Sequence, residues 1–206
     1  VPMPQDLPEL FVLRHGETAW NREGRLQGRL DSPLTELGLA QARAMAAALA
    51  ARGVGPDRYD LVHSPQGRAA RTAEAVAEAT GLRPRPDARL REIGVGDWAG
   101  LSPAEIDARW PRPHPDEPFL DRYACAPGGE PFADLLDRVA GFLAEQSRPA
   151  VVVTHGITSR ALRAAALGGG VPEMAALPGG QGVIFRIGGG VQTTLAPPLA
   201  PAQERG

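Results

Sequence analysis

A histidine between an arginine and a glycine follows the first apolar run of the chain, in a setting suited to binding phosphate. Arg14, His15 and Gly16 come directly after residues 10–13, Leu-Phe-Val-Leu. A short run that is apolar on both faces is typical of a buried strand in an open α/β sheet, where ligands bind beyond the carboxyl ends of the strands. The glycine lets the backbone bend away and leave the imidazole exposed. We therefore predict that His15 lies at a phosphate site.

A second histidine has the same setting. Residues 150–154, Ala-Val-Val-Val-Thr, have the pattern of a buried strand and lead directly into His155 and Gly156. If the two strands are parallel, both histidines face one crevice. Arg68, in the first turn of a predicted helix, adds a cation whose planar fork can hold two phosphate oxygens. Together with Arg14, these side chains predict a pocket for a tetrahedral dianion.

Strand and helix patterns alternate along the chain, as in a three-layer α/β sandwich. Helices are predicted at residues 36–51 with Thr35 as N-cap, 67–80 before Gly81, 103–110 after Ser102, 132–146 and 158–167. Strands are predicted at 10–13, 60–63 and 150–154, a closing hairpin at 183–187 and 191–195, and a strand or extended segment at 87–93. Residues 111–131, rich in proline and glycine, predict a surface lid or loop with little regular structure.

These elements predict one α/β domain over residues 1–206, a three-layer α/β/α sandwich with a central, mostly parallel sheet. The chain has 206 residues, of which 43% are hydrophobic, enough to bury one core. Residues 1–8 and 197–206 are expected to be frayed. An edge strand near Val191 could pair between two copies, so a homodimer is left open.

The charge balance excludes several classes of function. The net charge is -2 and the sequence contains no lysine, so it predicts no nucleic-acid partner, no lysine Schiff base and no nucleotide-binding P-loop. The four histidines show no short metal-ligand spacing, so neither a metal nor another cofactor is expected.

The cysteine count and the apolar pattern bear on location. Cys125 is the single cysteine, which excludes an internal disulfide and fits a reducing compartment. Prolines interrupt residues 1–8, so no secretory segment is expected there, and no apolar run is long enough to span a bilayer. We expect a cytoplasmic protein with no membrane partner.

Four blocks of the sequence, in order, resemble the histidine phosphatase superfamily, which contains the cofactor-dependent phosphoglycerate mutases and many small-molecule phosphatases. The blocks are residues 13–18 with Asn21, Gln27 and Gly28; residues 64–73 around Arg68; residues 90–94 with Trp98 and Gly100; and residues 153–156. The resemblance covers most of the chain and implies a phosphoglycerate mutase-like fold.

The resemblance also implies a role for each matching residue. His15 would be the nucleophile that becomes phosphohistidine, and Glu92 would be the proton donor. Arg14, Arg68 and a protonated His155 would surround the phosphoryl group and neutralise its charge without a metal. Substrate contacts are implied for Asn21, Gln27, Gly28 and Gly156.

The acid is the least determined of these roles. Glu17, Asp97 and Glu130 are other carboxylates that loops could bring to the pocket. They stay open as alternatives to Glu92.

The resemblance leaves three readings of the reaction. Hydrolysis of a small phosphate ester is favoured, because the segment from Asp97 to Glu130 is compact and lacks lysine, and because Gln27 stands where mutases carry a small hydroxyl residue. Mutase-type phosphoryl transfer stays open, since Arg109, Arg112 and Arg122 could bind a substrate carboxylate. A non-catalytic protein that binds phosphorylated ligands is the third. The variable residues 111–127 would select the substrate.

Overall fold

The computed structural model describes residues 7–111 and 118–199, and a six-stranded sheet forms its centre. Its strands are β1 (Leu10–Arg14), β2 (Asp60–His63), β3 (Pro84–Pro86), β4 (Ala150–Thr154), β5 (Ile184–Gly188) and β6 (Val191–Leu195). They lie in the order β3-β2-β4-β1-β5-β6. The four strands from β3 to β1 are parallel, β5 is antiparallel to β1, and β6 is antiparallel to β5. The predicted, mostly parallel central sheet is confirmed.

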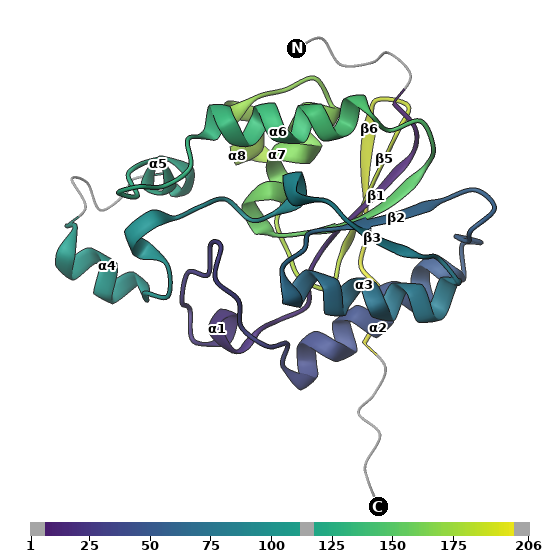
Figure 1. Cartoon of the computed structure of the whole chain (residues 1–206), viewed down its shortest axis with the longest axis horizontal. Coiled ribbons are helices and arrows are strands. Elements are labelled where there is room, and N and C mark those ends of the chain that lie inside the picture. Colours follow the sequence, from purple (N-terminus) through teal and green to yellow (C-terminus); the bar gives the residue numbers. More distant parts are fainter. Residues whose placement is uncertain (1–6, 112–117, 200–206) are drawn as a thin grey trace, which may run out of the picture.

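Helices cover both faces of this sheet. They are α1 (Ala19–Arg22), α2 (Glu36–Ala50), α3 (Gly67–Thr80), α4 (Pro103–Arg109), α5 (Phe119–Ala124), α6 (Phe132–Ala144), α7 (Gly156–Ala166) and α8 (Val171–Ala176). In Figure 1, α2 and α3 lie below the sheet and α6 and α7 lie above it. Helices α1, α4 and α5 lie to the left, on the side toward which β1 runs. The three layers of the predicted α/β/α sandwich are confirmed.

The central strands are apolar on both faces because each face meets a helix layer. Leu10 and Val12 of β1 pack in the cluster that contains residues of α6 and α7. Phe11 and Leu13 of the same strand pack with residues of α2 and α3. Burial on both faces explains why the strands are continuous apolar runs rather than alternating patterns.

Most of the predicted element boundaries agree with the structure. Thr35 caps α2, because its Oγ1 accepts a hydrogen bond from the Gly38 N–H at 3.0 Å. Ser102 caps α4, and Gly81 ends α3 in a left-handed conformation with φ of 73°. Helix α7 begins at Gly156, two residues before the predicted start, so His155 itself occupies the N-cap position.

The predicted strand or extended segment at 87–93 is wrong. The third strand is formed by residues 84–86, and residues 88–90 form a 3-10 helix. Asp87 explains the turn, because its Oδ1 accepts a hydrogen bond from the Arg89 N–H at 2.9 Å and so caps the first turn. The strand and the 3-10 helix are both too short to produce a periodic pattern of apolar residues in the sequence.

The expected irregular loop at 111–131 is also partly wrong, because it contains helix α5. Leu120 of this helix is buried, and the rings of Phe119 and Tyr123 lie 5.0 Å apart, one turn from each other. Residues 112–117 of the predicted loop lie outside the described residues, as do the expected frayed residues 1–6 and 200–206. Tertiary packing of these apolar side chains, rather than local propensity, accounts for the helix.

Two glycines let the turn after β1 approach helix α2 closely. A Cβ on Gly16 would lie 2.2 Å from the Gly38 carbonyl oxygen, and a Cβ on Gly38 would lie 2.0 Å from the Glu17 carbonyl oxygen. Neither position therefore accepts a side chain without movement of the backbone. This contact fixes the turn that carries His15.

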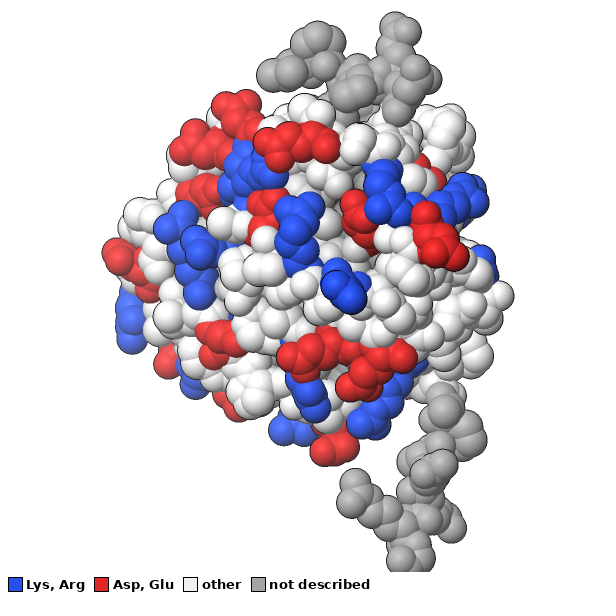
Figure 2. Space-filling model, turned by 45° about the vertical axis from the view of Figure 1, so that its right-hand side comes forward, with Lys and Arg blue, Asp and Glu red and all other residues white. Residues whose placement is uncertain are grey.

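Acidic and arginine side chains alternate over the face of the molecule drawn in Figure 2. No helix within residues 7–111 and 118–199 is long and apolar enough to cross a membrane.

Candidate active site

The parallel pairing of β1 with β4 brings the two His-Gly sequences together, as the sequence predicts. Arg14 is paired with Thr154, and the His15 N–H donates to the Thr154 carbonyl at 2.9 Å. The imidazoles of His15 and His155 follow, with ring centroids 5.1 Å apart and planes at 60°. Both histidines are buried, His15 with 2% of its surface exposed, so the expected exposed imidazole is wrong.

Hydrogen bonds fix the tautomer of His15. Its Nδ1 lies 2.8 Å from the Gly16 carbonyl oxygen, which can only accept, so Nδ1 carries the proton. The Nε of Arg68 donates to Nε2 of His15 at 3.2 Å, and a guanidinium has no acceptor. Nε2 therefore presents a lone pair, which is the form of a histidine that can attack phosphorus.

Ser64 fixes the tautomer of His155. Its Oγ lies 2.7 Å from Nε2 of His155 and accepts a hydrogen bond from the Gln66 N–H at 3.3 Å. Within the described residues, the hydroxyl proton has one other candidate acceptor, Oε1 of Gln66 at 3.4 Å, which is long for an O–H···O bond. Ser64 thus donates to Nε2, and the imidazole proton of His155 resides on Nδ1. That Nδ1 is buried and has no hydrogen-bond partner among the described residues.

Ser64→Ala is expected to lower kcat/KM about 10- to 100-fold, because a buried polar group left without its partner costs about 1–3 kcal/mol and His155 loses its fixed proton. Phosphate release by the purified variant measures the effect. Ser64→Cys, which keeps a weak donor of similar size, should recover part of the activity. An unchanged kcat/KM in Ser64→Ala would contradict the positioning of His155 by this hydroxyl.

The two arginines have different surroundings. Arg68 is buried and is held by three groups of the preceding loop: Nη1 donates to Asp31 Oδ1 at 2.8 Å and to the Leu30 carbonyl at 2.6 Å, and Nη2 donates to the Gly28 carbonyl at 3.0 Å. Arg14 has a buried Nε with no hydrogen-bond partner among the described residues. Arg68 is therefore fixed with its Nε toward His15, while Arg14 has donors to spare for an anion.

Burial lowers the pKa of both histidines well below the ordinary value. For His15, the charges of Arg14 and Arg68 lower the pKa further. For His155, the neighbouring His15 and the same two arginines act in the same direction. Burial and the two neighbouring arginines thus favour neutral imidazoles, whereas a protonated His155 beside a bound phosphoryl group stays a prediction of the resemblance.

These two pKa values make the free energy of unfolding depend on pH. Below about pH 6.5 the unfolded imidazoles take up protons while the folded ones stay neutral, so stability is complete above that pH and falls as pH decreases toward the lowered native values. The expected slope is about 1.4 kcal/mol per pH unit for each such histidine. Urea unfolding between pH 7 and pH 5 measures it. The double variant His15→Asn/His155→Asn should lose this slope, and the same slope in both proteins would contradict the assignment.

Glu92 lies at the N-terminus of helix α7. Its Oε1 accepts hydrogen bonds from the Thr158 N–H and the Thr158 hydroxyl, both at 3.0 Å, and its Oε2 accepts from the Ile157 N–H at 3.3 Å. These bonds fix the carboxylate of Glu92, which lines the same cavity as His15. The position agrees with the role that the resemblance implies for Glu92, although the contacts alone assign no chemistry.

The other carboxylates considered as acids are engaged elsewhere. Glu17 accepts a hydrogen bond from the Thr35 hydroxyl at 2.7 Å, and Glu130 forms an ion pair with Arg138, with 2.6 Å between Oε1 and Nε. Asp97 lies in the short 3-10 helix of residues 96–98. None of the three lines the cavity in front of His15, in which Glu92 is the one acid among the described lining residues.

This cavity, the His15 cavity, has a volume of about 180 Å³. It is lined by seven residues that the sequence predicts: Arg14, His15, Asn21, Gln27, Gly28, Arg68 and Glu92. His155 is not among the residues that line this cavity, although its ring is in contact with that of His15, and Gly156 lines an adjoining cavity instead. The predicted site is therefore brought together by the fold, with Gly156 placed next to it.

Two amides of the cavity are fixed in orientation. Asn21 Oδ1 accepts hydrogen bonds from the Thr18 N–H at 3.2 Å and from Gln181 Nε2 at 2.9 Å, which leaves its amide N–H groups for a ligand. Gln27 Nε2 donates to the Thr18 hydroxyl at 2.9 Å, and its buried Oε1 has no partner among the described residues. One amide thus offers donors to the cavity and the other offers an acceptor.

Tyr123 is a lining residue that the sequence does not predict. It comes from helix α5, and burial, with the nearby charge of Glu92, raises its pKa above the ordinary value. The sequence signal that could have predicted this helix is the spacing of Phe119 and Tyr123, four residues apart with Leu120 between them. Tyr123 therefore presents a neutral hydroxyl next to the acid.

Two of the arginines considered for a substrate carboxylate, Arg109 and Arg122, do not line this cavity. Arg109 is exposed on α4, and Arg122 stacks over Trp98 and donates to Asp107 at 2.8 Å. Arg112 lies outside the described residues. In the part of the chain that the structure describes, no group of three or more His, Cys, Asp or Glu side chains is arranged to hold a metal ion.

Comparisons with known proteins agree with this arrangement. A family model described as the histidine phosphatase superfamily (branch 1) matches residues 10–190. A glucosyl-3-phosphoglycerate phosphatase of Mycobacterium tuberculosis is 40% identical over 172 residues, 77% of this chain and 74% of that protein. A probable phosphoglycerate mutase, GpmB, of Salmonella paratyphi C is 38% identical over 172 residues, 78% of this chain and 75% of that protein.

A solved structure shows the same likeness in three dimensions. The structure of a mycobacterial glucosyl-3-phosphoglycerate phosphatase in complex with VO3 superposes with a TM-score of 0.72 at 37% identity. The match covers 87% of this chain and 92% of that one.

Proposed function

The chain belongs to the histidine phosphatase superfamily, branch 1, and from this we propose that it hydrolyses phosphomonoesters of a small metabolite through a phosphohistidine at His15, without a metal ion. The single observation that carries the proposal is the hydrogen bond from the Nε–H of Arg68 to Nε2 of His15, which shows that Nε2 has a lone pair. His15 lines a cavity that Glu92 also lines. A neutral imidazole with a fixed tautomer is a competent nucleophile toward phosphorus.

In the first step, His15 Nε2 attacks the phosphorus of the ester and the bond from phosphorus to the ester oxygen breaks. Arg14 and the N–H of Arg68 that now faces Nε2 bind the phosphoryl oxygens, and Nδ1–H of His155 donates to another. Glu92 gives its proton to the departing alkoxide. The products of this step are a phosphohistidine, the free alcohol and an ionised Glu92.

In the second step, water takes the place of the alcohol. The Glu92 carboxylate accepts a proton from the water, the water oxygen attacks phosphorus, and the bond from phosphorus to Nε2 breaks. Phosphate leaves, and both His15 and Glu92 return to their starting states. The buried acceptor Oε1 of Gln27 provides a place for a water or substrate hydroxyl within this cavity.

Phosphoryl transfer of the mutase type is the second candidate, and the likeness to the Salmonella protein supports it. A mutase must keep its phosphohistidine from water and pass the phosphoryl group to an acceptor alcohol. The fate of the phosphoryl group in labelled phosphoenzyme distinguishes a mutase from a phosphatase. Release to water without transfer to a phosphoglycerate excludes the mutase, and measurable turnover of any ester excludes the third possibility, a protein that only binds phosphorylated ligands.

The test of the proposal is phosphate release from a panel of phosphomonoesters, with EDTA present and His15→Ala as control. Release that continues with EDTA and disappears in the variant is the expected result. Activity that EDTA abolishes would contradict a metal-independent reaction, and no release from any ester would contradict hydrolysis.

The location and the partners stay predictions. A cytoplasmic protein that acts on a small phosphate ester, with no nucleic-acid or membrane partner, is what we propose. The edge strand β6, on which Val191 is exposed, could pair between two copies of the chain. The mass of the protein in solution tests for this homodimer.

A further inference from the structure

Gln66 is a buried side chain to which the two-step reaction above gives no part. It has 8% of its surface exposed and occupies the N-cap of helix α3, two residues before Arg68. An N-cap side chain usually accepts a hydrogen bond from the first turn of its own helix, but the side chain of Gln66 makes no such bond. Its amide bonds instead to two other segments, Glu92 and residues 28–30.

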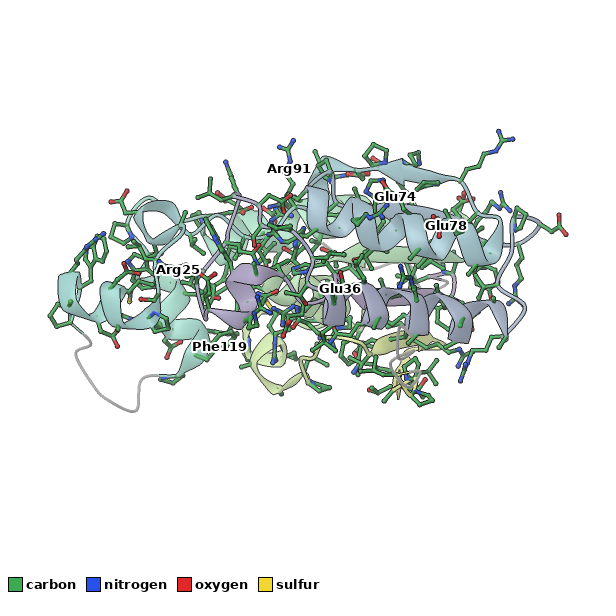
Figure 3. The ribbon with its side chains drawn as sticks, turned by 90° about the horizontal axis from the view of Figure 1, so that it is seen from below. Arg25, Glu36, Glu74, Glu78, Arg91 and Phe119 are labelled. Atoms are coloured by element: carbon green, nitrogen blue, oxygen red, sulfur yellow. The ribbon has the colours of Figure 1, made fainter. Side chains whose placement is uncertain are left out.

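The oxygen end of this amide holds the backbone of Glu92. Gln66 Oε1 accepts a hydrogen bond from the Glu92 N–H at 2.8 Å. Residues 91–94 belong to no helix or strand, and no backbone carbonyl among the described residues accepts from this N–H. In Figure 3, Arg91 extends away from the protein near the end of α3 that is farther from Glu78. The bond from Gln66 therefore takes the place of a sheet ladder in fixing the main chain of the acid.

The nitrogen end of the amide holds the loop that binds Arg68. Gln66 Nε2 donates to the Gly28 carbonyl at 2.9 Å and to the Leu30 carbonyl at 3.4 Å. The same two carbonyls accept hydrogen bonds from Nη2 and Nη1 of Arg68. A carbonyl oxygen has two lone pairs, so each can bond to both side chains. The loop, the guanidinium and the amide thus form one hydrogen-bonded unit.

The polarity of the amide fits these partners in one orientation. Its oxygen faces an N–H and its NH₂ group faces two carbonyls, so a rotation of the amide by half a turn would place donor against donor and acceptor against acceptor. An ionised glutamate would offer acceptors alone, and methionine would offer no strong donor or acceptor. Glutamine combines the donor and the acceptor that the two segments need.

We propose that Gln66 is a positioning residue for the acid: its amide fixes Glu92 relative to Arg68, and so places the proton for the leaving group relative to the phosphoryl group. Gln66 lines neither of the two adjoining cavities, so it acts through the backbone of Glu92 and not by contact with the substrate. The inference rests on the proposed function, in which Glu92 protonates the departing alkoxide. Loss of the amide should weaken this protonation more than binding of the phosphoryl group, because Arg68 keeps its own bonds to the loop and to Asp31.

The test compares an alkyl ester with an aryl ester. Gln66→Met keeps the length of the side chain and removes its donor and its acceptor, so the Glu92 N–H loses its partner. Glycerol 3-phosphate needs a proton on its leaving alkoxide, whereas p-nitrophenyl phosphate hardly needs one. We expect the ratio of kcat/KM for glycerol 3-phosphate to kcat/KM for p-nitrophenyl phosphate to fall about 3- to 10-fold, the scale of one hydrogen bond.

A double-mutant cycle with Glu92→Gln shows whether Gln66 acts through the acid. Glu92→Gln removes the acidic proton and lowers the same ratio by itself. If Gln66 positions that acid, adding Gln66→Met to Glu92→Gln should change the ratio by no more than about twofold. A purely structural role would lower the activity on both esters alike and leave the ratio unchanged. Equal effects of Gln66→Met on the ratio in the two backgrounds would overturn the proposal.

Two further variants serve as controls. Gln66→Asn keeps the amide on a side chain that is one methylene too short to reach both segments, so it should lower the ratio as well, and it covers the case in which Gln66→Met does not fold. Gln146→Met removes a comparable bond of 2.8 Å, from a side-chain amide to the Phe142 carbonyl, at a position that lines neither cavity. It should leave the ratio unchanged.

Amide hydrogen exchange tests the inference without turnover. The Glu92 N–H should exchange at least about fivefold faster in Gln66→Met than in the native protein, because it loses its acceptor, and at the native rate in Gln146→Met. If no ester is hydrolysed, the proposed function fails, and faster exchange still supports the positioning of Glu92 by Gln66. If esters are hydrolysed but the ratio stays native in Gln66→Met and Gln66→Asn, the positioning role is wrong and the proposed function stands. Native exchange in Gln66→Met would also overturn the positioning role.

Discussion

Replacing His15 with alanine is expected to lower kcat/KM for every phosphate ester by at least about 10⁴-fold, the scale of losses that follow removal of a covalent nucleophile. The reason is local. The structure offers one lone pair on an imidazole nitrogen in the His15 cavity, that of Nε2, and Arg68 already directs an N–H toward it. Direct attack by water would have to proceed without that nitrogen. Phosphate release by native and variant protein measures the difference.

Trapping of the phosphoenzyme provides an independent readout. Protein quenched during turnover of a labelled ester should carry the label on His15, in a bond that acid breaks and alkali leaves intact. His63→Gln is a suitable control, because His63 lies at the end of β2, bonds to the Ser64 carbonyl through Nδ1, and lines neither cavity. Label that stays on the His15→Ala variant, or loss of label in His63→Gln, would place the covalent intermediate elsewhere.

The parts of the site that the sequence predicts share one property: each depends on a local pattern. Residues 10–13 and 150–154 are apolar runs, and since both become parallel strands of one sheet, their ends must meet. Arg68 is placed by the start of α3, which Gly81 ends at the far side. Strand, turn and cap patterns therefore suffice to bring the histidines and the two arginines together.

The parts that the sequence does not predict depend on contacts between distant segments. Tyr123 reaches the cavity because helix α5 packs its buried leucine on the core, and no periodic pattern extends over so short a helix. The hydrogen bond from Ser64 to His155 joins residues 91 positions apart. The low pKa of His155 follows first from its burial and then from the nearby His15, Arg68 and Arg14, and neither burial nor the sum of these charges can be predicted from any one motif.

The contacts of Arg160, a lining residue of the adjoining cavity, depend on distant segments in the same way. The sequence predicts only that Arg160, four residues after Gly156, lies in the first turns of a helix. The loop carbonyls that occupy Nη1, and the glycine that leaves Nη2 uncovered, come from residues 174–179, outside that helix.

The replacement Glu92→Gln should have an effect that depends on the leaving group. The amide can keep the hydrogen bonds that Oε1 accepts from Thr158, and it loses one contact, the 3.3 Å bond from the Ile157 N–H, so the side chain should remain in place while its acidic proton is gone. Loss of general acid catalysis is worth about 10²–10⁴-fold for a poor leaving group such as the alkoxide of glycerol 3-phosphate. For p-nitrophenolate, a weak base that needs little protonation, the loss should be about tenfold or less.

The quantity to measure is kcat/KM rather than kcat, because Glu92 has a second task. Activation of water in the second step slows in the variant for every substrate alike, and that step affects kcat when it limits turnover. The value of kcat/KM ends at the first irreversible step, the transfer of the phosphoryl group to His15, so it isolates protonation of the leaving group. We expect the ratio of kcat/KM for the alkyl ester to kcat/KM for the p-nitrophenyl ester to fall at least about tenfold in Glu92→Gln. Equal losses on the two esters would remove Glu92 from the role of acid and leave it as the anchor of helix α7.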